Sequence, residues 1–214
     1  MDGLRFLGAL AGAYLLGALP VGYAITWLAK KVDIRTMGSG HTGGTNVLRV
    51  AGALPAALTV LCDATKGYAA VALARALAPG LPWMAALAGV LTVLGHNHSI
   101  FLAFRGGVGT MTTFGAALAL MPWGAVGAAL MGFAVVVARR YASLGSLTFA
   151  AIVPLACLLG AALGAWPWAY LLFAILSSLF SAWELRHNIQ RLRQGAERKI
   201  GQRVDPPAEP PTAP

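Results

Sequence analysis

The chain has 214 residues, of which 58% are hydrophobic and 11% are charged, and its formal net charge is +9. Soluble domains have roughly 25% charged residues, so most of this chain is predicted to face lipid rather than water. The basic residues lie in short gaps between long apolar runs, a pattern typical of cytoplasmic membrane loops and not of a nucleic-acid-binding surface.

Three apolar runs in the first half of the chain cover residues 6–29, 54–78 and 83–104. Each is long enough for a membrane helix, which needs roughly 20 apolar residues. The first run is too long for the apolar part of a signal peptide, and Lys30 and Lys31 follow it in place of a small-residue cleavage site. We therefore expect three membrane helices here.

Charge also defines the second half of the chain. No charged residue occurs between Arg105 and Arg139, and a turn signal at residues 121–124 divides this stretch. Residues 141–183 are likewise uncharged and are divided at residues 164–167. If every basic loop is cytoplasmic, each stretch crosses the membrane twice. The prediction is an all-α integral membrane protein with about seven transmembrane helices, its N-terminus outside and its C-terminus cytoplasmic.

Residues 1–200 are predicted to form a single multi-pass domain in the inner cell membrane. Its cytoplasmic side would hold two glycine-rich loops, at residues 37–49 and 104–110. Residues 201–214 are Pro-rich, and their composition predicts a disordered tail.

The two glycine-rich segments are predicted to bind phosphate groups. Glycines let backbone N–H groups approach an anion, and the helix that follows each segment adds a favourable field at its N-terminus. Arg49 and Arg105 can neutralise phosphate. The other candidates are Gly38, Ser39, Gly40, Gly43, Thr45 and Asn46 in the first segment, and Gly106, Gly107, Gly109 and Thr110 in the second. The alternative is a pair of flexible interhelical loops with incidental charge.

Polar residues within the apolar runs form a second group of candidates. Asp63 and Lys66 lie three residues apart, and they form either a structural ion pair or, through Lys66, a contact with a bound anion. His96 is expected to hydrogen-bond or to contact substrate. No metal site is expected, because His96 and His98 provide too few ligands. Residues 186–192 are predicted to form a basic interfacial helix that meets anionic lipid.

Five motifs in chain order resemble those of the PlsY family, the bacterial glycerol-3-phosphate acyltransferases that use acyl phosphate as the acyl donor. Each motif is modest alone, but the five together are specific, and they extend over nearly the whole chain. They read Gly38-Ser39-Gly40-x-x-Gly43-x-Thr45-Asn46-x-x-Arg49, Asp63-x-x-Lys66-Gly67, Gly95-His96 with Phe101-Leu102-x-Phe104-x-Gly106-Gly107-x-Gly109, Arg140-Tyr141-x-Ser143-Leu144, and Asn188-Ile189-x-Arg191-Leu192.

The resemblance implies a seven-helix fold with a cytoplasmic-side active site and no metal or other cofactor. It implies transfer of an acyl chain from acyl phosphate to the sn-1 hydroxyl of glycerol 3-phosphate, which gives lysophosphatidic acid for phospholipid biosynthesis. The implied partners are glycerol 3-phosphate, acyl phosphate and membrane lipid, with no nucleic acid. The implied catalytic residues are Ser39, Asn46, His96 and Asn188. The implied substrate-binding residues are Gly38, Gly40, Gly43, Thr45, Arg49, Lys66, Arg105, Gly106, Gly107, Gly109 and Ser143.

The sequence departs from the family pattern at three positions within these motifs and at one position three residues before the last motif. Val108 stands where the family usually has Lys, and Leu185 stands where it usually has His. His41 and Gly44 stand where it usually has Asn and Ala. Loss of a phosphate-facing cation is expected to weaken or abolish activity unless a neighbouring Arg or His compensates. Two alternative functions therefore stay open: a divergent paralogue that binds phosphorylated lipid precursors without this reaction, and an anion transporter.

Overall fold

The computed structural model describes residues 2–202, and the regular structure of this part of the chain is entirely helical. Of the predicted tail, residues 201 and 202 belong to the described part, whereas residues 203–214 lie outside it. Two short 3-10 helices, η1 (Ile34–Thr36) and η2 (Ile100–Leu102), lie in loops. The α-helices are α1 (Asp2–Ala18), α2 (Val21–Lys30), α3 (Gly44–Ala51), α4 (Ala53–Leu77), α5 (Pro82–Asn97), α6 (Thr110–Leu120), α7 (Pro122–Arg139), α8 (Ala142–Ala162), α9 (Tyr170–Glu184) and α10 (Arg186–Arg193).

Five helical stretches of the described chain are long and apolar enough to cross a bilayer. They are Gly3–Lys30, Ala53–Leu77, Pro82–Leu102, Pro122–Arg139 and Ala142–Ala162. Helices α6 and α9 are apolar but have only 11 and 15 residues, about 16 and 22 Å of a hydrocarbon core about 30 Å thick. The all-helical, multi-pass membrane class is confirmed. The count of seven crossings and the orientation of the termini stay predictions.

Proline and glycine set most of the helix breaks. Helix α7 begins at Pro122 directly after α6, and the chain turns between α8 and α9 around residues 164–167, as predicted. The first run is bent at Pro20, which separates α1 from α2, because proline lacks the N–H that a continuous helix needs. The third run is helical almost to its predicted end but is not one α-helix: α5 stops at Asn97, and residues 98–109 form a long loop that carries η2.

Glycines bring pairs of helices into close backbone contact. Gly67 of α4 lies against the carbonyl of Thr112 on α6, and Gly115 of α6 lies against the carbonyl of Ala64 on α4. Neither glycine has room for a Cβ atom, since the atoms it would meet belong to the neighbouring backbone. Close approach at small residues is typical of helix packing in membranes, where no hydrophobic force drives helices together.

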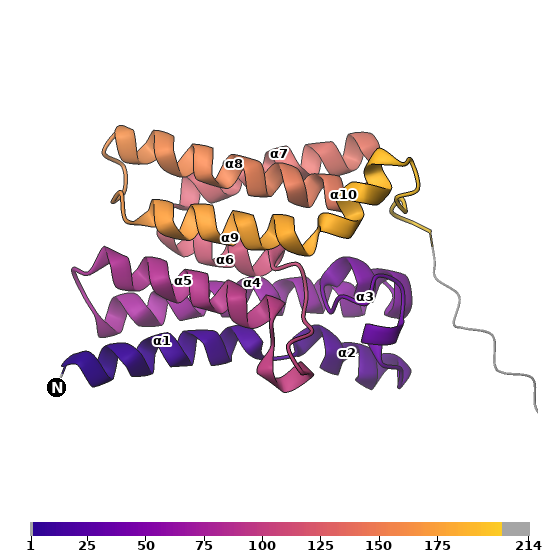
Figure 1. The fold of residues 1–214 in the computed structure, drawn as a ribbon, viewed down its shortest axis with the longest axis horizontal. Helices are drawn as coiled ribbons and strands as arrows, with labels where there is room; N and C mark the ends of the chain where they lie inside the picture. Colours follow the sequence, from indigo (N-terminus) through magenta and orange to yellow (C-terminus); the bar gives the residue numbers. More distant parts are fainter. Residues whose placement is uncertain (1, 203–214) are drawn as a thin grey trace, which may run out of the picture.

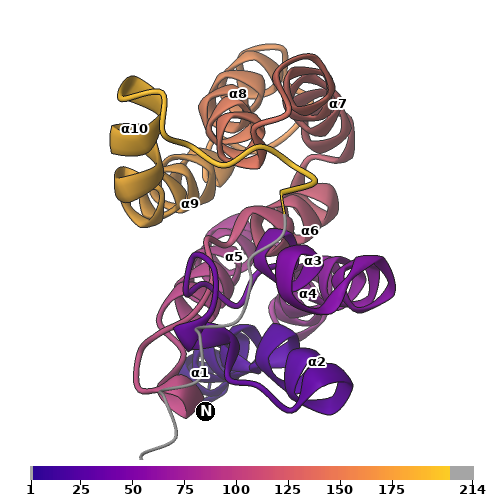
Figure 2. The same ribbon diagram turned by 90° about the vertical axis from the view of Figure 1, so that its right-hand side faces the viewer.

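The helices are arranged so that α3, α10 and the first glycine-rich segment lie at one end of the molecule. Helices α1 and α2 lie along one side, α7 and α8 lie along the other, and α4, α5 and α6 lie between them (Figures 1 and 2). Helix α9 packs against both α5 and α8. Helices α3 and α10 lie at the end opposite the N-terminus (Figure 1), and the first glycine-rich segment leads into α3.

Candidate active site

The two glycine-rich segments lie side by side. The backbone N–H of Thr42 donates to the carbonyl of Gly106 over 3.2 Å, and Gly22 of α2 packs against the carbonyl of Thr42. Residues of both segments line one cavity of about 320 Å³. The two segments must lie together in this way if they are to share one anion site.

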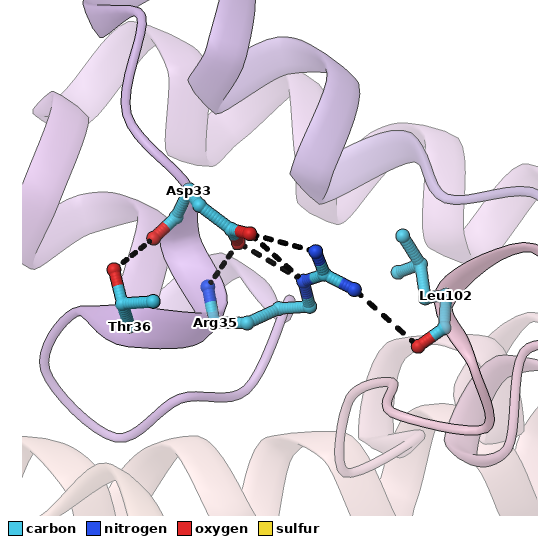
Figure 3. Close-up of polar contacts among 4 residues, drawn as sticks. All are labelled: Asp33, Arg35, Thr36 and Leu102. Carbon is cyan, nitrogen blue, oxygen red and sulfur yellow. Dashed lines mark hydrogen bonds and ion pairs between the residues drawn. The ribbon is translucent and has the colours of Figure 1, made fainter.

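An ion pair lies in the loop just before the first glycine-rich segment and contacts the loop just before the second. Arg35 donates through Nε and Nη2 to the carboxylate of Asp33 at 3.0 and 2.7 Å (Figure 3). Its Nη1 donates to the carbonyl of Leu102 at 3.5 Å. The hydrogen bond from Arg35 holds the pKa of Asp33 below its usual value. The pair therefore ties the loop after α2 to the loop after α5.

Asn46 holds the first glycine-rich segment in shape. Its Nδ2 donates to the carbonyls of Met37 at 3.0 Å and His41 at 2.9 Å, and its Oδ1 accepts from the backbone N–H of Ser39 at 3.1 Å. Gly38 has a φ of 61°, and a Cβ atom there would collide with Asn46 Oδ1. These contacts are those of a positioning residue, and a catalytic role for Asn46 stays a prediction.

Two helix N-termini face the cavity. Helix α3 begins at Gly44, and Gly43 and Thr45 on either side of it also line the cavity. Helix α6 begins at Thr110 after Gly109, whose φ is 84°, and both residues line the cavity. A helix N-terminus presents free backbone N–H groups and a partial positive charge, so two of them suit bound phosphate groups.

A buried charged cluster lies between the helices behind the cavity. Lys66 Nζ lies 2.9 Å from Asp63 Oδ1 and 2.9 Å from Nδ1 of His96, and it donates to the carbonyl of Leu19 at 3.3 Å. Asp63 Oδ1 is 3.5 Å from His96 Nδ1. The structure therefore contains the ion pair, one of the two alternatives that the sequence left open. Asp63 and His96 line the cavity, while contact of Lys66 with an anion stays a prediction.

Glu197 joins three parts of the site, and the sequence reasoning missed it. Its Oε1 accepts from Ser143 Oγ at 2.9 Å and from Asn188 Nδ2 at 2.8 Å, and its Oε2 accepts from Arg191 Nε at 2.8 Å. Burial raises the pKa of Glu197, but these three hydrogen bonds and the charge of Arg191 together outweigh it and leave the pKa below its usual value. The available signal was that Glu197 is the only acidic residue among residues 186–204.

The segment that carries Glu197 crosses the end of the molecule. After α10 it runs toward α6 and α3 (Figure 2). Two hydrogen bonds hold it to Arg140: Ile200 N–H donates to the carbonyl of Arg140 at 2.7 Å, and Nη2 of the Arg140 side chain donates to the carbonyl of Ile200 at 3.1 Å. Arg49 Nη2 donates to the carbonyl of Arg198 at 3.4 Å. The segment thus forms one border of the cavity.

Away from the charged groups, the cavity wall is apolar. Phe133 and Val136 of α7, Phe149 of α8 and Met111 of α6 contribute to it. The cavity therefore has a polar end and an apolar wall, and part of that wall comes from α7 and α8, which are long and apolar enough to cross a bilayer.

The structure places the predicted site residues in two groups. Those that line the cavity are Ser39, Gly43, Thr45, Asn46, Arg49, His96, Gly109, Ser143 and Asn188. Those that do not line it are Gly38, Gly40, Lys66, Arg105, Gly106 and Gly107. Gly106 and Gly107 instead pack against the end of α5, since a Cβ atom on either would collide with His96. Val108 and Leu185, the departures from the family pattern, both line the cavity.

The fold and the site together define a multi-pass membrane protein with a cavity that has two helix N-termini at its polar end and an apolar wall beside them. A family model described as glycerol-3-phosphate acyltransferase matches residues 7–195. The chain belongs to the glycerol-3-phosphate acyltransferase family, as its motifs suggested.

Individual relatives agree with this assignment. The chain is 45% identical over 198 residues to a glycerol-3-phosphate acyltransferase of Halalkalibacterium halodurans, a match that covers 91% of this chain and 95% of that one. It is 44% identical to glycerol-3-phosphate acyltransferase 1 of Deinococcus radiodurans, over 94% of this chain and 98% of that one.

Solved structures are also similar. The crystal structure of PlsY, an integral membrane glycerol 3-phosphate acyltransferase, in its glycerol 3-phosphate form gives a TM-score of 0.84 at 33% identity, over 92% of this chain and 96% of that one. The lysophosphatidic acid form of PlsY gives a TM-score of 0.81 at 31% identity, over 92% of this chain and 95% of that one.

Proposed function

We propose that this chain transfers an acyl group from acyl phosphate to the sn-1 hydroxyl of glycerol 3-phosphate and releases lysophosphatidic acid and inorganic phosphate. The observation that carries the proposal is the cavity itself. Two helix N-termini and Arg49 suit phosphate groups at its polar end, while Phe133 and Phe149 offer an apolar surface to a fatty chain.

The bond changes follow from the substrates. The glycerol 3-phosphate hydroxyl oxygen attacks the acyl carbonyl carbon, a C–O ester bond forms, and the bond from that carbon to the phosphate oxygen breaks. The hydroxyl proton leaves with the phosphate. Because a mixed anhydride is already reactive, orientation and charge stabilisation can supply most of the acceleration.

Phosphate groups are assigned to the polar end of the cavity. Ser39, Thr45 and Ser143 provide hydroxyl donors there, and Arg49 provides a fork of N–H donors. Backbone N–H groups of both glycine-rich segments complete the two proposed phosphate-binding sites. Asn188 is assigned to hold Glu197, which in turn orients Ser143.

His96 is assigned as a hydrogen-bond donor, not as a base. Lys66 carries only N–H donors, so Nδ1 of His96 accepts and the neutral ring holds its proton on Nε2. That nitrogen lies beside Gly107, on the second glycine-rich segment. From there it can donate toward an oxygen that becomes more negative during acyl transfer. The proton of the attacking hydroxyl is assigned to a substrate phosphate oxygen.

The topology is part of the proposal. Seven crossings, an outside N-terminus and a cytoplasmic C-terminus would place the site at the cytoplasmic face of the inner membrane, where both substrates are available. The basic residues at the ends of α2 and α7 and in α10 support this orientation. Family membership does not favour the alternatives of a non-catalytic paralogue or an anion transporter.

The test is acyl transfer by the purified protein in lipid vesicles, supplied with acyl phosphate and radiolabelled glycerol 3-phosphate. We expect labelled lysophosphatidic acid and an equal amount of phosphate. Ser39→Ala is expected to lower kcat/KM about tenfold through loss of one hydrogen bond. Ser178→Ala is the matched control, because Ser178 lies on α9 and does not line the cavity.

Two results would contradict the proposal. Retained glycerol 3-phosphate binding without phosphate release would favour a non-catalytic paralogue. Movement of labelled phosphate into sealed vesicles in the absence of acyl donor would favour a transporter.

A further inference from the structure

Two histidines and one carboxylate meet beside the cavity. Nε2 of His41, in the first glycine-rich segment, lies 3.7 Å from Oε2 of Glu184 at the end of α9. Nε2 of His98, in the loop after α5, lies 3.5 Å from Oε1 of the same carboxylate. The Glu184 side chain is largely buried. Three separate elements are therefore joined at one titratable cluster.

His41 is the member of this cluster that reaches the site. It lines the cavity, whereas Glu184 and His98 do not. His41 therefore contacts the cavity on one side and the Glu184 carboxylate on the other.

The cavity has few positive charges to offer to phosphate. Among the described residues that line it, Arg49 is the one permanent cation, and Asp63 and Glu197 are carboxylates. Asp63 pairs with Lys66, and Glu197 accepts from Arg191. Among the described residues that line the cavity, a second cation can therefore come only from a histidine, His41 or His96.

We propose that His41, backed by Glu184 and His98, is a phosphate-binding residue whose contribution depends on its protonation. Protonated His41 donates an N–H and a positive charge to a substrate phosphate, while Glu184 stabilises the imidazolium from behind. The inference rests on the proposed function, since it takes the cavity to hold a phosphate-bearing substrate. It makes substrate affinity rise as the solution becomes more acidic.

Other charged groups around the cluster do not provide the same response. On α5, His96 contacts the pair of Asp63 and Lys66. On the loop after α2, Arg35 and Asp33 neutralise each other.

Arg186, two residues after Glu184, donates to the carbonyl of Trp183 and lies over its ring. Tyr14 of α1 donates to the backbone carbonyl of His98.

The test measures binding of glycerol 3-phosphate to the purified full-length protein by isothermal titration calorimetry at about pH 6 and pH 8, on either side of the range in which histidines titrate. His41→Asn keeps a polar side chain but cannot carry a charge. We expect it to bind about five- to tenfold more weakly than the unmodified protein at the lower pH, a modest coupling, and almost equally at the higher pH. The phosphate itself gains a proton near pH 6, so the comparison is between proteins at one pH.

Two further variants sharpen the result. Glu184→Gln leaves the cavity lining intact and is expected to move the rise in affinity to lower pH, because the imidazolium loses its carboxylate. His187→Asn is the matched control, since His187 is exposed on α10 and does not line the cavity. It is expected to bind as the unmodified protein does at both pH values.

The outcomes separate this inference from the proposed function. Equal weakening by His41→Asn at both pH values, or no weakening at either, would overturn it. So would glycerol 3-phosphate binding that is undetectable in the unmodified protein. Normal pH-dependent binding with no acyl transfer would instead support the role of His41 and contradict the proposed reaction.

Discussion

At the scale of single residues, Glu197 connects the parts of the site that come latest in the chain. It accepts from Ser143 on α8 and from Asn188 and Arg191 on α10. A carboxylate can accept several hydrogen bonds at once, and charge-assisted bonds are stronger than neutral ones. The position of the cavity wall therefore depends on the charge of one side chain.

Glu197→Gln is expected to destabilise the protein by about 2 kcal/mol, because the amide cannot accept all three hydrogen bonds and brings donors of its own. Thermal unfolding in detergent measures this change. Arg193→Gln, an exposed substitution on α10, is the control. Equal melting temperatures for Glu197→Gln and the unmodified protein would show that the three hydrogen bonds contribute no net stability.

The lowered pKa of Glu197 also predicts a pH dependence. Because its folded-state pKa lies below the usual value of 4.5, its contribution to stability is fully present above about pH 4.5 and is lost as the pH falls through the folded-state pKa. The unmodified protein should therefore lose stability below pH 4.5 more steeply than Glu197→Gln. Parallel unfolding profiles for the two proteins would contradict this.

The ion pair of Asp33 and Arg35 connects the loop after α2 to the loop after α5. Arg35→Lys keeps the charge but loses the fork that bonds both carboxylate oxygens and reaches Leu102. The pair is partly exposed, so we expect a loss of about 1 kcal/mol or less in stability. We also expect faster amide hydrogen exchange in residues 34–43, measured by mass spectrometry. Unchanged exchange there would mean that the pair does not hold the loop.

Residue type identified many of the polar groups of the site but did not reveal how they are used. Ser39, Arg49 and Ser143 could be picked out from their motifs, and all three line the cavity. The bonds of Asn46 to carbonyls within its own loop depend on how that loop folds. Glu197 was missed because its donors lie up to 54 positions away in the chain, a separation that no local pattern encodes.

At the scale of elements, close contact between α4 and α6 fixes where α6 begins and hence where its N-terminus points. Gly67→Ala would force the new Cβ atom against the backbone of Thr112. A backbone atom cannot rotate away as a side chain can, so we expect a loss of about 2–3 kcal/mol in stability.

Gly127→Ala is the control for this substitution. Gly127 lies inside α7 with no neighbouring heavy atom near the position of a Cβ atom. Alanine there should be neutral or stabilising by up to about 1 kcal/mol, since it favours the helix. Melting temperatures of the two variants compare the effects directly. A loss at Gly67→Ala no larger than at Gly127→Ala would contradict the packing argument.

The breaks between elements were predictable where the chain marks them chemically. Pro122 and the segment at residues 164–167 interrupt apolar runs with turn residues, and helices change there. The loop at residues 98–109 carries no such warning at its start. Ile100 and Phe101 are as apolar as a helix core, yet they are about half exposed in the structure, at 51% and 55%. Hydropathy alone cannot distinguish a membrane helix from an apolar loop that lies against lipid.

At the scale of the whole molecule, topology decides on which side the substrates reach the cavity. If α9 crosses the membrane, the loop between α8 and α9 and the end of α10 lie on opposite faces. If α9, with only 15 residues, does not cross, they lie on the same face. One pair of positions therefore distinguishes the two arrangements.

Labelling of single cysteines in intact cells tests this. In a background with Cys62→Ala and Cys157→Ala, the variants Ala165→Cys and Gln194→Cys each place a thiol at an exposed position. Ala165→Cys should react with a membrane-impermeant maleimide from outside. Gln194→Cys should react only after the membrane is permeabilised, because the basic residues of α10 hold that end in the cytoplasm. Labelling of both positions from the same side would mean that α9 does not cross, while the reverse pattern would place the cavity outside, away from its proposed substrates.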